Sequence, residues 1–195
     1  MAVGGEAFTT AAAYSIFSSP GSKVGWSSLL LGPLKIPRNN FIFFLAILVK
    51  LSSLDKPWLS HLGTTCILCQ DGQLETHDHL FFRCRYARRC LEVIRQLVRF
   101  YWLNREWLRD VAWASVKWRG RHIINAAFRA LLASLVYHIW QERNRRRFQQ
   151  LDTSSSILAF ITVGKSNTEF LVLIYLSLLV HADCIDCGGT LAYRG

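Results

Sequence analysis

The stretch that decides how this chain can fold is "CILCQDGQLETHDHLFFRC", residues 66–84. It places Cys66, Cys69, His79 and Cys84 in the pattern C-x2-C-x9-H-x4-C. Thiolate sulfur and imidazole nitrogen are the ligands that zinc prefers, in tetrahedral sets of four. The pattern therefore predicts a Zn2+ site. Because four protein ligands leave no open coordination position, we expect a structural site and not a hydrolytic one.

A second histidine and a fourth cysteine compete for places in this site. His77 lies two residues before His79, so one ion would not naturally take both. The spacing to Cys84 favours His79, and we expect His77 to be exposed or to lie just outside the ligand set. Cys90 follows six residues after Cys84 on an apolar stripe, which predicts core packing for its side chain.

Two carboxylates lie close enough in sequence to support the site from outside. Asp78 precedes His79 directly and could accept the free ring N–H of that histidine, and Glu75 could do the same. A further group of potential ligands, "HADCIDC" at residues 181–187, offers at most three, and we interpret it as incidental.

The charge of the chain is strongly basic and unevenly distributed. The formal net charge is +10, and residues 66–150 hold sixteen Lys and Arg against seven Asp and Glu. Nearly all these cations are arginines, whose guanidinium fork matches phosphate geometry. A partner that carries phosphate is one interpretation, and a solvated helix face is the other.

The apolar periodicity predicts a mainly α fold. Residues 121–148 keep an i, i+3, i+4 spacing through Ile124, Phe128, Leu131, Leu135 and Ile139, which predicts one long helix. Residues 86–102 predict an amphipathic helix with a basic outer face, its apolar stripe formed by Leu91, Ile94, Leu97, Val98 and Tyr101.

Shorter elements flank these two helices. Residues 8–17 predict a short helix, and residues 32–40 a connector. The apolar run 41–51 fits a buried helix or a buried strand, and periodicity does not decide between them. Residues 52–62 predict a turn into another short helix, with Ser52 or Ser53 as its cap.

Three segments follow from these patterns. Residues 1–65 form an N-terminal helical part, 66–150 the CCHC site with basic amphipathic helices, and 151–195 an apolar tail of uncertain structure, because the basic character ends abruptly at Gln150. We expect an irregular helical domain stapled by one zinc ion. The N-terminus lacks the basic region of a signal peptide, so we expect an intracellular protein of the nucleus or cytoplasm.

We expect no membrane partner. The apolar runs at residues 41–51 and 170–182 are shorter than a bilayer requires, although an anchor at 170–182 stays open as an alternative.

Three separated motifs carry a resemblance to a known family. They are "PRNNFIFFLAILVKLSSLDKPW", "CILCQDGQLETHDHLFFRCRYA" and "VYHIWQERNRRRF". Over about residues 4–150 the chain resembles the zinc-binding domain of plant non-LTR (LINE-type) retrotransposon reverse transcriptases. The resemblance implies Cys66, Cys69, His79 and Cys84 as zinc ligands, with the signature glutamate at Glu75.

The resemblance departs from the family at several points. The family usually has Trp-Leu-Ala where this chain has Phe44, Leu45 and Ala46. Beyond Gln150 no resemblance is found, and a shifted reading frame or an intron would explain that break.

The function that we expect is a zinc-stabilised nucleic-acid-binding module, RNA or DNA, derived from a reverse transcriptase. No enzymatic activity is expected, because the acids are scattered and neither polymerase nor ribonuclease H motifs are present. The alternative is a structural or protein-interaction remnant of a retroelement polyprotein, docking on a reverse transcriptase domain.

The residues expected to face phosphate form two basic groups. They are Arg83, Arg85, Arg88 and Arg89, and then Arg143, Arg145, Arg146 and Arg147. Phe82 and Tyr86 could stack on unpaired bases, although core packing is the competing interpretation for at least one of Phe81 and Phe82.

Overall fold

The computed structural model describes residues 24–32, 34, 36–98 and 106–165. Among these residues it contains helices and one isolated bridge between Thr65 and Leu74, with no strand, so the mainly α prediction is confirmed. The predicted helix at 8–17, the apolar run at 170–182 and the cysteine group at 181–187 lie outside the described residues.

The centre of the molecule is the long helix α6, Ile123–Gln149. It was predicted at residues 121–148, and the structure confirms it. Its apolar stripe faces the other helices, and Leu131, Leu135 and Ile139 are buried. By length and composition α6 could cross a membrane, but 61% of its most apolar window is buried inside the protein, which is the arrangement of a core helix.

One side of α6 is covered by α3, Pro37–Ile47, so the run that fitted either a helix or a strand is a helix. The helix begins within the predicted connector, because proline has no N–H to lose at the first helical position. Asn39 of α3 donates to the Ser134 hydroxyl of α6 over 2.9 Å. Phe43 is fully buried and meets the Trp107 ring edge-on.

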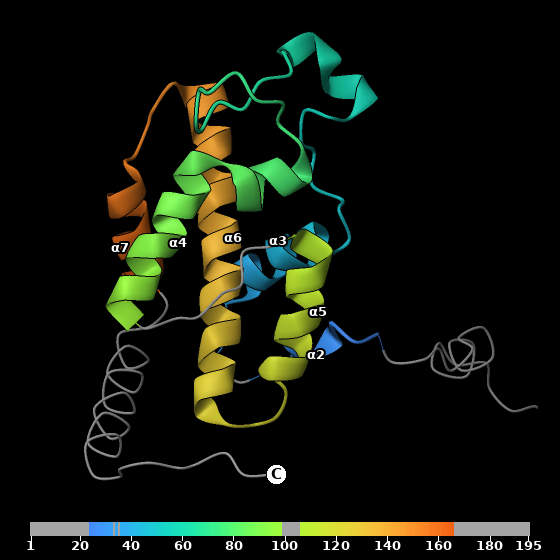
Figure 1. Cartoon of the computed structure of the whole chain (residues 1–195), viewed down its shortest axis with the longest axis vertical. Helices are drawn as coiled ribbons and strands as arrows, with labels where there is room; N and C mark the ends of the chain where they lie inside the picture. The colour runs from blue at the N-terminus through green and yellow to red at the C-terminus, as the bar shows by residue number, and fades with distance from the viewer. Residues whose placement is uncertain (1–23, 33, 35, 99–105, 166–195) are drawn as a thin grey trace, which may run out of the picture.

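Two further helices lie beside this pair (Figure 1). They are α2, Ser27–Leu30, and α5, Trp107–Lys117, which contact each other. The turn that joins α5 to α6 passes through Gly120, whose φ of +100° suits glycine. The helix α5 ends three residues before this glycine.

The opposite side of α6 carries α4, Arg85–Val98, and α7, Ser155–Lys165, packed against each other. The predicted stripe of α4 is only partly correct. Cys90 and Ile94 are fully buried, whereas Leu97 is 41% exposed. The sequence pattern does not show that α7 covers the face of α4 that bears Cys90, and this contact sets which face is buried.

The first part of the predicted tail therefore belongs to the fold. The Tyr86 hydroxyl donates to the Thr153 carbonyl over 2.8 Å, and the Cys90 thiol donates to the Ser155 carbonyl over 3.4 Å. The Thr153 N–H donates to the Glu142 carboxylate over 2.6 Å. These bonds fix the start of α7 to α4 and α6, although the composition changes at Gln150.

Two short helices shape the region that precedes α4. A 3-10 helix, η1, covers Pro57–Leu62, where a short helix was predicted. Before it, the Ser53 hydroxyl donates to the Asp55 carboxylate over 2.5 Å. A π-helical turn, η2, covers His79–Arg83 and leads directly into α4.

Candidate metal centre

The loop that carries Cys66 and Cys69 is held by its own backbone. The Cys66 N–H donates to the Gln73 carbonyl, and the Glu75 N–H to the Thr64 carbonyl, each over 2.8 Å. Between these bonds the chain reverses through Gln70 and Gly72, with φ values of 55° and 70°. The reversal turns both thiols toward the same point.

The other two members of the cluster come from the two ends of η2. The His79 N–H donates to the Thr76 hydroxyl over 3.0 Å, which caps the start of this turn. The Cys84 N–H donates to the His79 carbonyl over 2.7 Å, and Cys84 immediately precedes α4. The π-helical turn therefore brings His79 and Cys84 to the same side of the chain.

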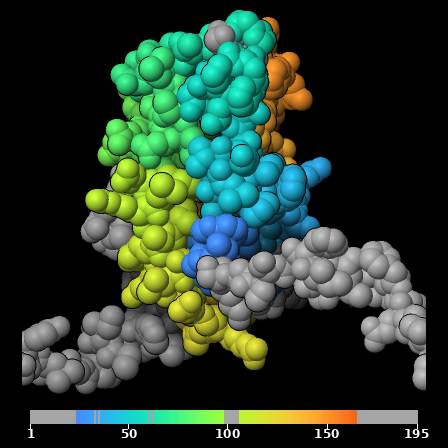
Figure 2. Space-filling model, turned by 90° about the vertical axis from the view of Figure 1, so that its right-hand side faces the viewer, coloured from blue at the N-terminus to red at the C-terminus, as the bar shows by residue number. Residues whose placement is uncertain are grey.

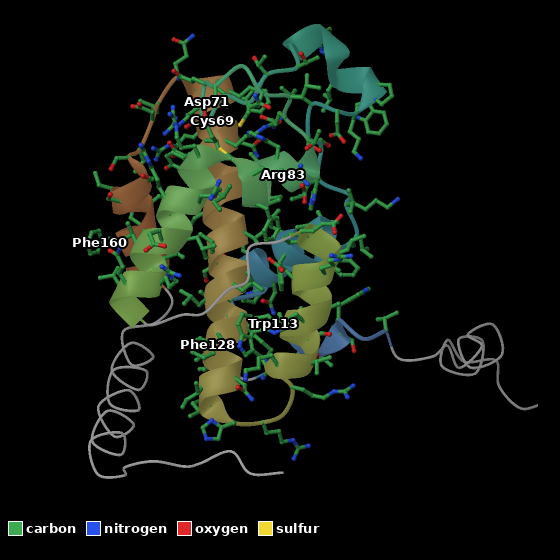
Figure 3. The ribbon with its side chains drawn as sticks, in the orientation of Figure 1. Cys69, Asp71, Arg83, Trp113, Phe128 and Phe160 are labelled. Atoms are coloured by element: carbon green, nitrogen blue, oxygen red, sulfur yellow. The ribbon has the colours of Figure 1, made fainter. Side chains whose placement is uncertain are left out.

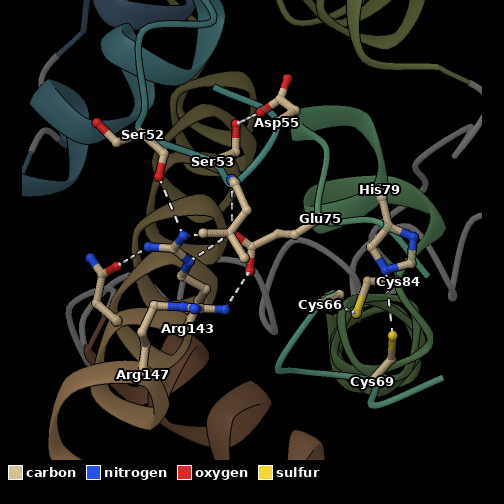
Figure 4. Close-up of polar contacts among 12 residues, drawn as sticks. Ser52, Ser53, Asp55, Cys66, Cys69, Glu75, His79, Cys84, Arg143 and Arg147 are labelled. Atoms are coloured by element: carbon tan, nitrogen blue, oxygen red, sulfur yellow. Dashed lines mark hydrogen bonds and ion pairs between the residues drawn. The ribbon is translucent and has the colours of Figure 1, made fainter. Parts of the chain in front are cut away.

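The four side chains meet at one point, as the sequence predicts (Figure 4). Their ligand atoms all lie within 4.8 Å of one another, and all four residues are buried. The Sγ atoms of Cys66 and Cys84 are 3.9 Å apart, and Cys69 Sγ lies 3.4 Å from His79 Nε2. In a tetrahedral site with ordinary zinc bond lengths, these spacings are roughly 3.8 and 3.5 Å. The residues therefore fit a tetrahedral metal ion.

The side chains of the cluster differ in the direction of their pKa shifts. Cys66 and Cys84 share a hydrogen bond, which raises the pKa of Cys66 and lowers that of Cys84. N–H groups at the start of α4 add to the lowering at Cys84. Burial raises the pKa of Cys69 and lowers that of His79, so the imidazole is held neutral, as a ligand requires. A metal ion would allow the buried thiols to ionise together.

The two carboxylates expected to orient His79 have other partners. Asp78 pairs with Arg83 over 2.7 Å and accepts the Trp107 N–H over 3.3 Å. Glu75 is buried and accepts from Arg143 through Nε at 2.9 Å and Nη2 at 2.6 Å. The expectation is corrected on this point: Asp78 and Glu75 tie the cysteine loop to the surrounding helices.

We call residues 66–75, which carry Cys66 and Cys69, the metal loop. The ion pair between Glu75 and Arg143 connects the metal loop to α6 (Figure 4). The same carboxylate oxygen accepts the Leu54 N–H over 3.3 Å, and Arg143 Nη2 reaches the Ser52 carbonyl over 3.3 Å. The guanidinium also stacks over the Trp140 ring, 4.9 Å from its centroid. Three segments of the chain are joined at this pair.

The basic group at the end of α6 is largely enclosed, which corrects its expected role toward phosphate. The side chain of Arg143 is 3% exposed, and those of Arg146 and Arg147 are each 12% exposed. Arg145 is 35% exposed and, like Arg146, pairs with the buried Glu142.

The contacts of Arg146 show that the basic group at the end of α6 holds other segments of the fold together. Arg146 donates to the Leu68 carbonyl over 3.3 Å and to the Thr153 carbonyl over 2.8 Å, and it lies over the Tyr86 ring. The guanidinium thus joins the metal loop, α4 and the start of the tail to α6.

The other basic group is at the surface. Arg83 and Arg85 are 69% and 59% exposed, and they pair with Asp78 and Asp71. Arg88 and Arg89 of α4 are exposed and have no ion pair within the described part of the chain. Figure 3 shows Arg83 at the same end of the molecule as Cys69 and Asp71.

Several aromatic and histidine side chains lie elsewhere than expected. His77 is 5% exposed and packs edge-on against Phe81 and Trp107, so it is a core residue. Phe82 and Tyr86 are 5% and 8% exposed, which removes them as stacking platforms for bases. Cys90 is fully buried, as predicted.

Trp107 is the residue that the sequence did not single out. Its ring is 3% exposed and contacts His77, Phe81 and Phe82 behind the metal loop. These ring contacts could not be predicted from the sequence, because Trp107 lies in α5 whereas Phe81 and Phe82 lie in η2.

Comparison with known proteins supports the metal centre. Residues 8–90 match the family described as zinc-binding in reverse transcriptase. The match includes all four residues of the cluster and ends at Cys90, so it does not extend over α5, α6 and α7. No curated protein and no solved structure was found to match the chain.

Proposed function

We propose that this chain is a zinc-stabilised nucleic-acid-binding module derived from the reverse transcriptase of a plant LINE-type retrotransposon, without catalytic activity of its own. The observation that carries the proposal is the exposed arginine face formed by Arg83, Arg85, Arg88 and Arg89, which flanks Cys84, the last residue of the metal cluster. The family match at residues 8–90 supports zinc as the metal.

The metal has a positioning role in this proposal. Cys84 is a cluster residue and immediately precedes α4, so an ion held there would fix the first turn of that helix. Arg88 and Arg89 lie on this part of α4. Four fixed ligands supply structural stability and no open position for a reacting water.

Arginine on a fixed helix suits phosphate better than bases. The aromatic residues near this face are buried, so stacking contributes little and contacts with the backbone dominate. We therefore expect binding that depends strongly on salt and weakly on sequence. The buried acids Glu75 and Glu142 are engaged with arginines, which is consistent with a non-catalytic domain.

The test is a titration of labelled single-stranded and duplex oligonucleotides, followed by fluorescence anisotropy at several salt concentrations. The variant carries Arg88→Glu with Arg89→Glu. The control carries Arg109→Glu with Lys117→Glu, which changes the charge equally at two exposed cations of α5, away from this face.

We expect the Arg88/Arg89 variant to bind at least about tenfold more weakly, or about 1.4 kcal/mol. For single strands, the slope of log affinity against log salt should fall by about 1.4 if two phosphate contacts are lost. Equal binding by variant and control would contradict the proposal. Binding of a reverse transcriptase domain that ignores salt would favour the docking alternative.

A further inference from the structure

A second basic site lies at the other end of the bundle, around Arg129 of α6. Arg129 is 5% exposed, and its Nη1 donates to the Trp118 carbonyl over 2.6 Å and to the Gly120 carbonyl over 3.0 Å. Its Nε is buried and has no hydrogen-bond partner among the described residues. The structure also gives Arg129 no acidic partner within the described residues.

A pocket opens beside this guanidinium. Its volume is about 520 Å³, and it is lined by Ser28, Leu31, Gly32, Gly120, Arg121 and Arg129. Gly32 leaves space beside the guanidinium, because a Cβ at this position would lie 3.1 Å from Arg129 Nη2. Gly32 also has a φ of +151°, which favours glycine.

The two described segments that line the pocket lack acidic residues around it. Neither residues 24–54 nor residues 111–141 contain an Asp or Glu, although these two segments form α2, α3, most of α5 and most of α6. The same segments carry exposed cations at Arg38, Lys50, Lys117, Arg119 and Arg121. Figure 2 shows α2 in blue beside α5 in yellow-green on this face. Within these two segments no carboxylate offsets the positive potential at the pocket.

The two carbonyls that accept from Arg129 do not supply a negative charge to balance its guanidinium. The two hydrogen bonds use Nη1 alone and resemble those of the cation that often caps the end of a helix such as α5. A buried guanidinium without an anion is costly, because desolvation disfavours the charge. A pocket with a second arginine at its rim supplies the place for an anion.

We infer that this pocket binds a phosphate group, held by Arg129 at its base and Arg121 at its rim. The phosphate could be free or part of a nucleic-acid backbone, and both present the same tetrahedral oxyanion to the arginines. The inference is independent of the arginine face on α4, which lies at the metal end of the molecule.

The test follows NMR signals of the full chain during addition of inorganic phosphate at constant ionic strength. The informative signals are the Arg129 Nε–H and the backbone N–H groups of Gly32 and Gly120. Leu31→Glu places a carboxylate at the pocket, and Leu31 is 61% exposed, so the fold should tolerate the change. Leu108→Glu is the control, because Leu108 is 66% exposed on α5 and does not line the pocket.

We expect saturable shifts of these signals in the wild type and in Leu108→Glu, with binding at least tenfold weaker in Leu31→Glu and in Arg121→Ala. A second titration with a single-stranded oligonucleotide of about ten nucleotides identifies the source. Shifts with both ligands indicate a backbone phosphate, and shifts with inorganic phosphate alone indicate a free one.

Absence of saturable shifts with both ligands would overturn the inference, as would equal binding by Leu31→Glu and Leu108→Glu. The Arg88/Arg89 variant should keep its phosphate shifts. Failure of the proposed function would therefore leave this site detectable, and the two results can be told apart.

Discussion

Replacing Arg143 with Met would leave the Glu75 carboxylate buried without its main counter-charge. The two side chains are 3% and 0% exposed, and their shortest N–O distance is 2.6 Å. After the change, the nearest cation would be Arg147, whose Nη2 lies 4.0 Å from Glu75 Oε2. Met keeps most of the volume and the contact with Trp140, so the variant tests mainly the charge.

Breaking a buried ion pair by removing one partner costs about 3–5 kcal/mol. For a domain of this size, 1 kcal/mol corresponds to about 2–4 °C in Tm, so we expect Tm to fall by roughly 6–20 °C. The assay is urea and thermal unfolding followed by circular dichroism. Arg95→Met is the matched control, because Arg95 is 53% exposed and its pair with Glu92 lies at the surface.

The double variant Glu75→Gln with Arg143→Met separates the pair from the rest of the site. It removes both charges, so it should be more stable than Arg143→Met alone. Because Glu75 lies in the loop between Cys69 and His79, Arg143→Met should also weaken metal binding. The reasoning would be refuted if Arg143→Met and Arg95→Met lost the same stability.

Three further predictions concern the metal, the tail and Cys90. The purified chain should contain one zinc per molecule, and Cys84→Ser and His79→Ala should both lose the zinc together with helical content, whereas Cys90→Ser should keep both. Metal analysis and circular dichroism measure the zinc content and the helical content. Zinc retained in both Cys84→Ser and His79→Ala would mean that the cluster is misassigned. A chain that ends at Gln150 lacks the buried Leu158 and Val163 and should lose at least about 3 kcal/mol of stability. In the full chain burial raises the pKa of Cys90 to about 12, so its thiol should react slowly with alkylating reagents at pH 8. Equal alkylation of Cys90 in the full and shortened chains would contradict the packing of α7.

The metal cluster and the central helix could be predicted because both depend on short-range patterns. The spacing of Cys66, Cys69, His79 and Cys84 limits where the chain can place its ligands, and the structure brings them together as expected. The period of apolar residues in α6 follows from helix geometry alone. The helix α3 was left open between two interpretations, since an apolar run without periodicity fits either one.

The roles of the charged residues depended on contacts between distant segments. Arg143 and Arg88 look alike in sequence, but Arg143 lies 68 residues from the glutamate that it pairs with, whereas Arg88 is exposed. Similarly, α7 follows a break in composition, and only its packing on α4 shows that it belongs to the fold.

The sequence by itself therefore determined the candidate metal cluster, the helical class and the basic character of this protein. Tertiary structure decided which arginines are buried as ion-pair partners, which remain at the surface, and where an arginine without a carboxylate partner lies beside a pocket. The physical reason is that local spacing fixes ligand geometry and helix periodicity, whereas burial and charge pairing arise only when segments far apart in the chain come into contact.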